Sequence, residues 1–228
     1  MTVNVFILGR TGCGKSAAAR YIAKFARERQ WSIERVNDYP ILSRMFLKDR
    51  QQAQFAPTKY GGFDIKDFSV LDLALKELEE QIRDIPAEQK KLLLIEFARA
   101  DYEQAFRQMD FNILKDAYFL FIDANVDTCV QRVHERVKNQ QTADDYYVSD
   151  KILRSYFNEQ LMPDTIGTSR VTFIKNRGSL CELAKKVHDF VDNVLRQEAY
   201  LLEHQDIPGE DEEQHIRELV SAASSATR

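Results

Sequence analysis

The chain has 228 residues, of which 30% are charged and 44% are hydrophobic. These proportions are ordinary for a folded, soluble protein, and they exclude a wholly disordered or collagen-like chain. The length suits one substantial domain. A formal net charge of -4 excludes a broad basic field for binding the backbone of nucleic acids.

Cysteine usage and the N-terminal residues bear on location. The three cysteines, Cys13, Cys129 and Cys181, are scattered and show no CxxC spacing. This pattern disfavours a disulfide framework or a zinc site and predicts a cytoplasmic protein. The apolar run before Gly9 is too short for a signal peptide or a membrane span, so we expect no membrane segment.

Short apolar runs alternate with longer amphipathic stretches along the chain. Five runs predict strands, at residues 3–8, 32–36, 92–97, 118–122 and 171–174. Apolar residues at three- and four-residue spacing predict helices at 16–29, 68–82, 128–137 and 179–196. The alternation is typical of an α/β domain in which crossover helices connect buried parallel strands.

Two connections are longer than a simple crossover requires, and such insertions often carry substrate contacts or lids. We therefore expect a domain over 1–200 that contains an acceptor-binding insertion (41–90) and a lid (129–165). Beyond it, residues 201–228 contain an acidic run and predict a mobile tail.

Residues 9–16 read GRTGCGKS and match the pattern GxxxxGK[ST]. The match directly follows the first predicted strand and opens a helix, as a phosphate-binding loop requires. Glycines allow the tight turn, and a helix N-terminus favours bound anions. The residues predicted to contact nucleotide are Gly9, Arg10, Thr11, Gly12, Cys13, Gly14, Lys15, Ser16 and Ala17. Cys13 serves as a small loop residue, although its place near a helix N-terminus also allows a lowered thiol pKa.

In such a loop Lys15 reaches the β and γ phosphates and Ser16 helps to coordinate magnesium, so ATP and Mg²⁺ are the expected cofactors. Kinases, GTPases and mechanical ATPases all use the loop. No Asn-Lys-x-Asp guanine reader is present, and the chain is short for the larger ATPases. A small kinase or a nucleotide-gated binding protein remains.

The sequence resembles the P-loop nucleoside and nucleotide kinase superfamily, which includes thymidylate kinase, deoxynucleoside kinases and dephospho-CoA kinase. The resemblance spans about residues 2–194. It implies a three-layer P-loop NTPase fold with a five-stranded parallel sheet, helices on both faces and a helical lid.

Residues 119–124 followed by 129–136 look like the fourth strand and the arginine-bearing lid helix of these kinases. Arg132 and Arg136 are four residues apart, so both can project from one helix face toward one anion. The alternative is a solvated helix face. The Asp-Arg pair often found in the thymidylate kinase lid is absent downstream, which disfavours that assignment.

Residues 174–183 are similar to the Asn-x-Gly-Ser-Leu-x-x-Leu segment beside the adenine in dephospho-CoA kinases. The resemblance implies nucleotide contacts from Asn176 and Gly178. Ser179 and Glu182 also form a capping box, which explains those two residues by local structure alone.

Three charged residues lie at the ends of predicted strands or just after them. Glu96 ends the third strand and looks like a Walker B carboxylate that manages magnesium together with Ser16. Arg99 resembles an arginine that faces the acceptor in deoxynucleoside and thymidylate kinases, with a surface-loop cation as the alternative. Asp38 is the general-base candidate, or else the start of a turn.

The acceptor pocket is expected at the carboxyl ends of the strands, walled by residues 41–68. Cations in this segment suit an acceptor with a phosphate, and aromatic residues could stack on a base or belong to the core. The cations are Arg44, Lys48, Arg50 and Lys59. The aromatic residues are Tyr39, Phe46, Phe55, Tyr60 and Phe63.

The sequence therefore predicts an ATP- and Mg²⁺-dependent phosphotransferase that acts on a nucleoside, nucleotide or similar small metabolite. Lys15, Arg132 and Arg136 stabilise the transferring charge, and Asp38 and Arg99 place the acceptor. The alternative from another class is a nucleotide-sensing protein that regulates a partner. A kinase of nucleic-acid ends is a third possibility, disfavoured by the net charge; a homodimer is left open.

Overall fold

The computed structural model describes residues 2–139, 145–157 and 170–204. It divides into two compact units, residues 1–191 and 192–228. The described part of the second unit, 192–204, is the C-terminal portion of one long helix. The predicted acidic tail and much of the second half of the predicted lid lie outside the described residues. No described helix combines the length and apolarity needed to cross a membrane.

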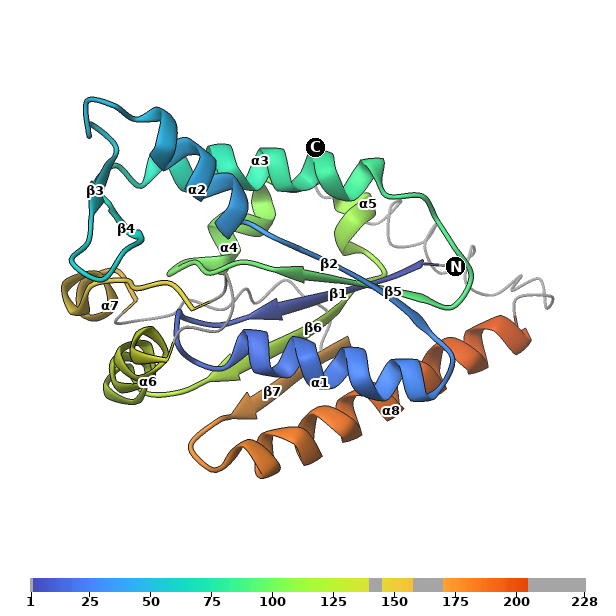
Figure 1. The fold of residues 1–228 in the computed structure, drawn as a ribbon. Helices are drawn as coiled ribbons and strands as arrows, with labels where there is room; N and C mark the ends of the chain where they lie inside the picture. Colours follow the sequence, from blue (N-terminus) through green and yellow to red (C-terminus); the bar gives the residue numbers. More distant parts are fainter. Residues whose placement is uncertain (1, 140–144, 158–169, 205–228) are drawn as a thin grey trace, which may run out of the picture. The chain divides into compact units, whose positions relative to one another are not determined.

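A five-stranded sheet, parallel throughout, forms the centre of the first unit (Figure 1). Its strands lie in the order β2-β5-β1-β6-β7. Their bounds are β1 (Thr2–Leu8), β2 (Ser32–Asn37), β5 (Lys91–Glu96), β6 (Tyr118–Asp123) and β7 (Val171–Lys175). The α/β fold and all five predicted strands are confirmed, and each strand ends within one residue of its predicted limits.

The four predicted helices are present as α1 (Lys15–Glu28), α3 (Ser69–Asp84), α6 (Val126–Lys138) and α8 (Leu180–His204). Helix α8 continues beyond its predicted end. The sequence missed the shorter elements, because a helix of one to three turns gives little periodicity. These are α2 (Tyr39–Lys48), α4 (Tyr102–Arg107), α5 (Phe111–Leu114), α7 (Asp150–Ser155) and the hairpin of β3 (Phe55–Pro57) and β4 (Phe63–Ile65).

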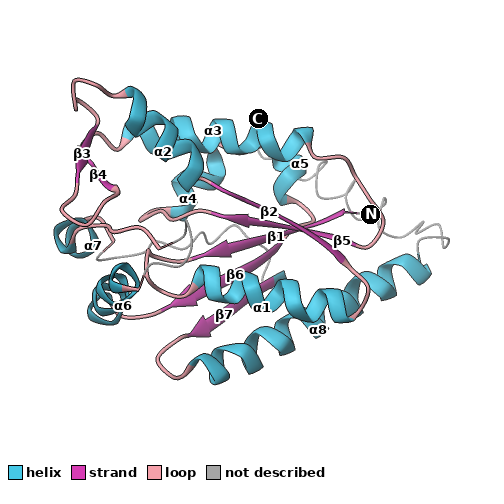
Figure 2. Ribbon diagram, viewed as in Figure 1, coloured by secondary structure: helices cyan, strands magenta, loops and turns pink. Residues whose placement is uncertain are grey.

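Helices cover both faces of the sheet, as Figure 2 shows. On one face, α2 to α5 close over an aromatic core in which Phe6 stacks on Phe119 with ring centroids 5.1 Å apart. Phe106 meets the edge of Phe6 at 5.7 Å. On the other face, α1 buries Ala18, Ile22 and Ala26, and the first half of α8 lies alongside it. The interlocked rings fix the sheet against α4.

Parallel strands end at the same edge of a sheet, and here that edge gathers the polar residues that follow the apolar strands. The register aligns Ile7 and Asn37 with Glu96, and Asp123 with Lys175. The loop after β1 therefore meets the ends of β2, β5, β6 and β7. This convergence is the structural basis of the candidate site.

Candidate functional site

The loop between β1 and α1 turns through three glycines with positive φ, which are +133° at Gly9, +85° at Gly12 and +112° at Gly14. A Cβ atom at Gly14 would lie 2.5 Å from Nδ2 of Asn176, so a side chain is excluded there by position as well as by conformation. No side chain caps the N-terminus of α1. The N–H groups of this turn therefore remain available to an anion.

Lys15 is buried at the start of α1, where its ammonium donates to the carbonyl oxygens of Gly9 at 2.7 Å and Arg10 at 3.0 Å. Burial of a charged ammonium is costly unless hydrogen bonds compensate it, and the loop carbonyls supply them. The cation is thus held inside the loop where a phosphate would sit.

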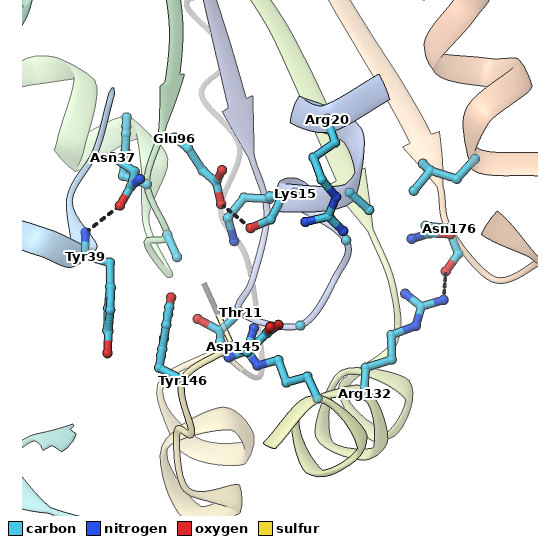
Figure 3. A pocket seen from close by; sticks show the side chains of 18 of the residues that line it. Thr11, Lys15, Arg20, Asn37, Tyr39, Glu96, Arg132, Asp145, Tyr146 and Asn176 are labelled. Carbon is cyan, nitrogen blue, oxygen red and sulfur yellow. Dashed lines mark hydrogen bonds between the residues drawn. The ribbon is translucent and has the colours of Figure 1, made fainter. Parts of the chain in front are cut away.

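A pocket of about 440 Å³ opens over this loop (Figure 3). It brings together most of the predicted site residues, from every strand end except that of β6. Predicted residues in its wall are Thr11, Gly12, Gly14, Lys15, Ser16, Ala17, Asp38, Glu96, Arg132, Arg136, Asn176 and Gly178. Gly9, Arg10, Cys13 and Arg99 do not line it.

Cys13 is fully buried, and burial raises the pKa of its thiol. The expectation of a lowered pKa is therefore wrong, because desolvation outweighs the nearby Lys15 charge. The backbone of Cys13, not its thiol, makes the structural contacts. Its carbonyl oxygen accepts hydrogen bonds from Nδ2 of Asn176 at 2.8 Å and from Nη1 of Arg132 at 3.3 Å. These bonds tie the loop to α6 and to the end of β7.

The predicted metal ligands meet at the first turn of α1. The Ser16 hydroxyl lies 3.3 Å from Oε1 of Glu96. Hydroxyl and carboxylate oxygens are the donors that Mg²⁺ prefers. Among the described residues, no group of three or more His, Cys, Asp or Glu side chains could hold a metal. A hydroxyl and a carboxylate at one point fit a metal that takes nucleotide phosphates and water as its other ligands.

Arg35 is a residue of this site that the sequence did not single out. Its Nη2 lies 2.5 Å from Oε2 of Glu96 and donates to the Ser16 hydroxyl at 3.3 Å. The side chain rises from β2 beside β5. A basic residue inside a predicted strand is the only sequence signal for it, and that signal names no partner.

Arg132 and Arg136 both reach the pocket from α6, as predicted from their spacing. Arg132 also donates to the backbone carbonyl of Asn176 at 3.3 Å (Figure 3). Arg136 lies over the ring of Tyr146, 4.7 Å from its centroid, and its Nε and Nη2 are buried with no hydrogen-bond partner among the described residues. These buried donors are ready for an anionic ligand.

Asp38 and Arg99 form a buried ion pair, with Nη1 2.7 Å from Oδ2. Arg99 is 3% exposed and also donates to the carbonyl of Leu71 at 2.7 Å. It is therefore no surface cation, and it lines neither the nucleotide-side pocket nor the apolar pocket described next. The ion pair holds the Asp38 carboxylate at the pocket wall.

A second, smaller pocket adjoins the first and is lined almost entirely by aromatic and aliphatic side chains. The two share Thr11, Asp38, Tyr39, Ala98 and Tyr146. Tyr39 stacks on Tyr146 with centroids 3.7 Å apart and planes 7° apart. The aromatic residues in its wall are Tyr39, Phe63, Phe68, Tyr146, Tyr156 and Phe157.

The cations predicted for an acceptor phosphate do not line either of these pockets. Arg44 pairs with Glu77 on the surface, and Lys59 lies over the ring of Tyr60 at 4.6 Å. That residues 41–68 wall an acceptor pocket stays a prediction, and the side chains of Arg44 and Lys59 make other contacts.

Tyr102 was also missed. Its hydroxyl accepts from the backbone N–H of Gly9 at 2.7 Å, and burial raises the pKa of the phenol. The neutral phenol braces the start of the phosphate loop from α4.

No family model and no curated protein sequence matches this chain. Solved structures do match it. A gluconokinase from Sinorhizobium meliloti 1021 aligns with 87% of this chain and 96% of its own at 11% identity, with a TM-score of 0.51. The APS kinase CysC of Mycobacterium tuberculosis, solved with AMPPNP and APS, aligns with 84% of this chain and 98% of its own at 15% identity and a TM-score of 0.51.

Kti12 of Chaetomium thermophilum, solved with ADP-AlF3, aligns with 84% of this chain and 97% of its own at 12% identity and a TM-score of 0.54. At such identities the similarity shows the fold. The chain has the fold of the P-loop kinases. The predicted resemblance is thus confirmed for the fold. The matching structures do not support thymidylate, deoxynucleoside or dephospho-CoA kinase in particular.

Proposed function

We propose that this protein is an ATP- and Mg²⁺-dependent phosphotransferase that moves the γ-phosphate to a hydroxyl of a small molecule. The observation that carries the proposal is the contact between two pockets of different chemistry. A polar pocket over the phosphate loop adjoins an apolar, aromatic one, and the Asp38 carboxylate lies in the wall of both. A donor and an acceptor could therefore meet at Asp38.

Phosphoryl transfer depends mainly on positioning and on neutralising the charge of the transferring group. Lys15 is placed to contact the phosphates, and Arg136 brings to the same wall buried donors that have no partner in the described part of the chain. Ser16 and Glu96 would hold the magnesium, which neutralises phosphate charge when bound. Asp38, held by Arg99, would orient the acceptor hydroxyl and accept its proton.

The acceptor belongs to the nucleoside, nucleotide or similar class in this proposal. A flat ring could stack against Tyr39, Phe63 or Phe68 in the apolar pocket. Among its described lining residues, only Thr11 and Asp38 carry short polar groups, apart from the tyrosine hydroxyls. The pocket therefore favours an acceptor whose buried part is an uncharged ring.

The test is ADP production from ATP across nucleosides, nucleoside monophosphates and phosphorylated metabolites, with Lys15→Ala as the control. Stimulation by one acceptor that Lys15→Ala abolishes would support the proposal. ATP binding with no stimulation by any acceptor would contradict it.

A regulator that binds or slowly hydrolyses ATP is the second candidate, and one observation favours it. The stacked pair Tyr39–Tyr146 lies between the two pockets, and the apolar pocket is only about 60 Å³. An acceptor would have to part these rings. If nucleotide binding alone moves Tyr146, as a change in tyrosine fluorescence that Tyr146→Phe removes would report, while no acceptor is phosphorylated, the regulator is the better description.

A further inference from the structure

A guanidinium already lies between the two side chains expected to hold magnesium. Nη2 of Arg35 is 2.5 Å from the Glu96 carboxylate and 3.3 Å from the Ser16 hydroxyl, and these two ligands are themselves 3.3 Å apart. The three groups form a closed triangle at the base of the phosphate loop. Lys15, a cation of the loop, instead donates to the carbonyls of Gly9 and Arg10.

The triangle is partly shielded from water, since the side chain of Arg35 is 26% exposed and that of Glu96 10%. Like charges a few ångströms apart repel more strongly in such surroundings than in bulk water. A divalent cation and this guanidinium would also need the same lone pairs on Glu96 and Ser16. The metal and the guanidinium therefore compete for the oxygens of Glu96 and Ser16.

We propose that Arg35 is a built-in cation that takes the place of magnesium when the metal is absent and must give way when it binds. This inference rests on the proposed nucleotide site. Arg35 acts as a positioning residue: it keeps Glu96 and Ser16 aimed at one point, and it sets how much metal the site requires. The expected signature is that the site binds Mg²⁺ more weakly with Arg35 present than without it.

The test measures metal binding directly, with Mn²⁺ as the probe. Free Mn²⁺ is titrated by electron paramagnetic resonance against the protein–ADP complex of the full chain and of three variants. Arg35→Gln removes the charge, and Arg35→Lys keeps the charge without a planar fork that can span two ligands. Arg27→Gln is the matched control, because Arg27 is exposed on α1 beside the same shallow groove as Arg35 and also carries one charge.

Arg35→Gln is expected to bind Mn²⁺ roughly tenfold more tightly than the parent chain, as the loss of one nearby like charge predicts. The Mn²⁺ affinity of Arg35→Lys should lie between those of Arg35→Gln and the parent, and that of Arg27→Gln should equal the parent's. In EDTA the order reverses: Arg35→Gln should bind metal-free ADP several-fold more weakly, because its stand-in cation is gone. If Arg35 had a purely structural role, Arg35→Gln would weaken both Mn²⁺ binding and metal-free ADP binding.

Equal or weaker Mn²⁺ binding by Arg35→Gln, with Arg35→Lys unchanged, would overturn the inference while leaving the nucleotide site intact. If the parent chain binds no ADP at all, the proposed function fails first and the inference with it. Circular dichroism melts of the variants establish that each is folded, and Arg35→Lys alone still decides the question if Arg35→Gln is not.

Discussion

Individual residues in this site are held by partners far away in the sequence. Asp38 and Arg99 are 61 residues apart, yet they form one buried ion pair, and Arg99 adds a bond to the Leu71 carbonyl in α3. Breaking one partner of such a pair leaves an uncompensated charge in the interior. The pair therefore links the stability of the domain to the placement of the candidate base.

Asp38→Asn or Arg99→Gln should each lower the free energy of unfolding by about 3–5 kcal/mol, since each strands its partner. The double variant should lose less than the sum of the two. Urea unfolding measures all three. Fully additive losses would mean that the pair contributes nothing as a pair. If Asp38→Asn stays folded and keeps full acceptor phosphorylation, Asp38 is not the base.

Gly14→Ala should abolish ADP binding. Its φ of +112° and a Cβ 2.5 Å from Nδ2 of Asn176 would force Asn176 off the Cys13 carbonyl and distort the loop. Gly61→Ala is the control, because Gly61 also has positive φ, +78°, but its Cβ would meet nothing within 4 Å. Calorimetric ADP titration should separate them, with Gly61→Ala binding as the parent does. Normal binding by Gly14→Ala would refute the steric argument.

Among the elements, α6 carries Arg132 and Arg136, two of the three arginines that line the polar pocket; the third, Arg20, belongs to α1. Its first turn is capped by Asn125, whose side-chain oxygen accepts from the N–H of Thr128 at 2.7 Å. Val133 of α6 packs into a small cluster with Tyr147, Leu153 and Phe157 from the α7 segment. The arginines thus depend on a helix that is held by its cap, by this apolar contact and by the bonds of Arg132 to the Cys13 and Asn176 carbonyls.

Asn125→Ala should cost about 1 kcal/mol of stability, the usual value of an N-cap, and should also weaken ATP binding through Arg132. Ser149→Ala removes the corresponding cap of α7, an element that carries no polar-pocket residue. It should lose comparable stability with ATP affinity unchanged. Equal effects of the two variants on affinity would show that α6 does not position the arginines independently.

At the scale of the whole molecule, the interior disfavours thiolates. Burial raises the pKa of Cys13 above its ordinary value of 9.0 and that of Cys129 to about 12, whereas Cys181 is exposed. Above pH 9 the unfolded chain therefore loses thiol protons that the native chain retains. By linkage, the stability that these thiols contribute is fully present below about pH 9 and is lost as the pH rises from there through the raised native pKa, about 12 for Cys129.

Two measurements check this. Urea midpoints should fall between pH 8 and pH 10, and less so in a Cys13→Ala variant, which lacks one of the retained protons. Iodoacetamide at pH 8 should label the native chain once, at Cys181, and leave a Cys181→Ser variant unlabelled until urea is added. Rapid labelling of native Cys13 or Cys129 would contradict their burial.

The sequence by itself determined the order of strands and helices and the phosphate loop. Those signals are local: apolar runs, helical spacing and GRTGCGKS each lie within a few turns of chain. It also placed Glu96, Arg132 and Asn176 correctly at the pocket, because all parallel strands end at one edge. Short elements such as α4 and the β3–β4 hairpin carry too little periodicity to predict.

Only the tertiary structure decided which side chains pair. Arg99 pairs with Asp38, Arg35 spans Ser16 and Glu96, and Tyr102 reaches the loop from α4. Each of these contacts joins residues 19 to 93 positions apart. A buried charge or hydroxyl must find a partner, and the packing of the sheet determines which one lies within reach.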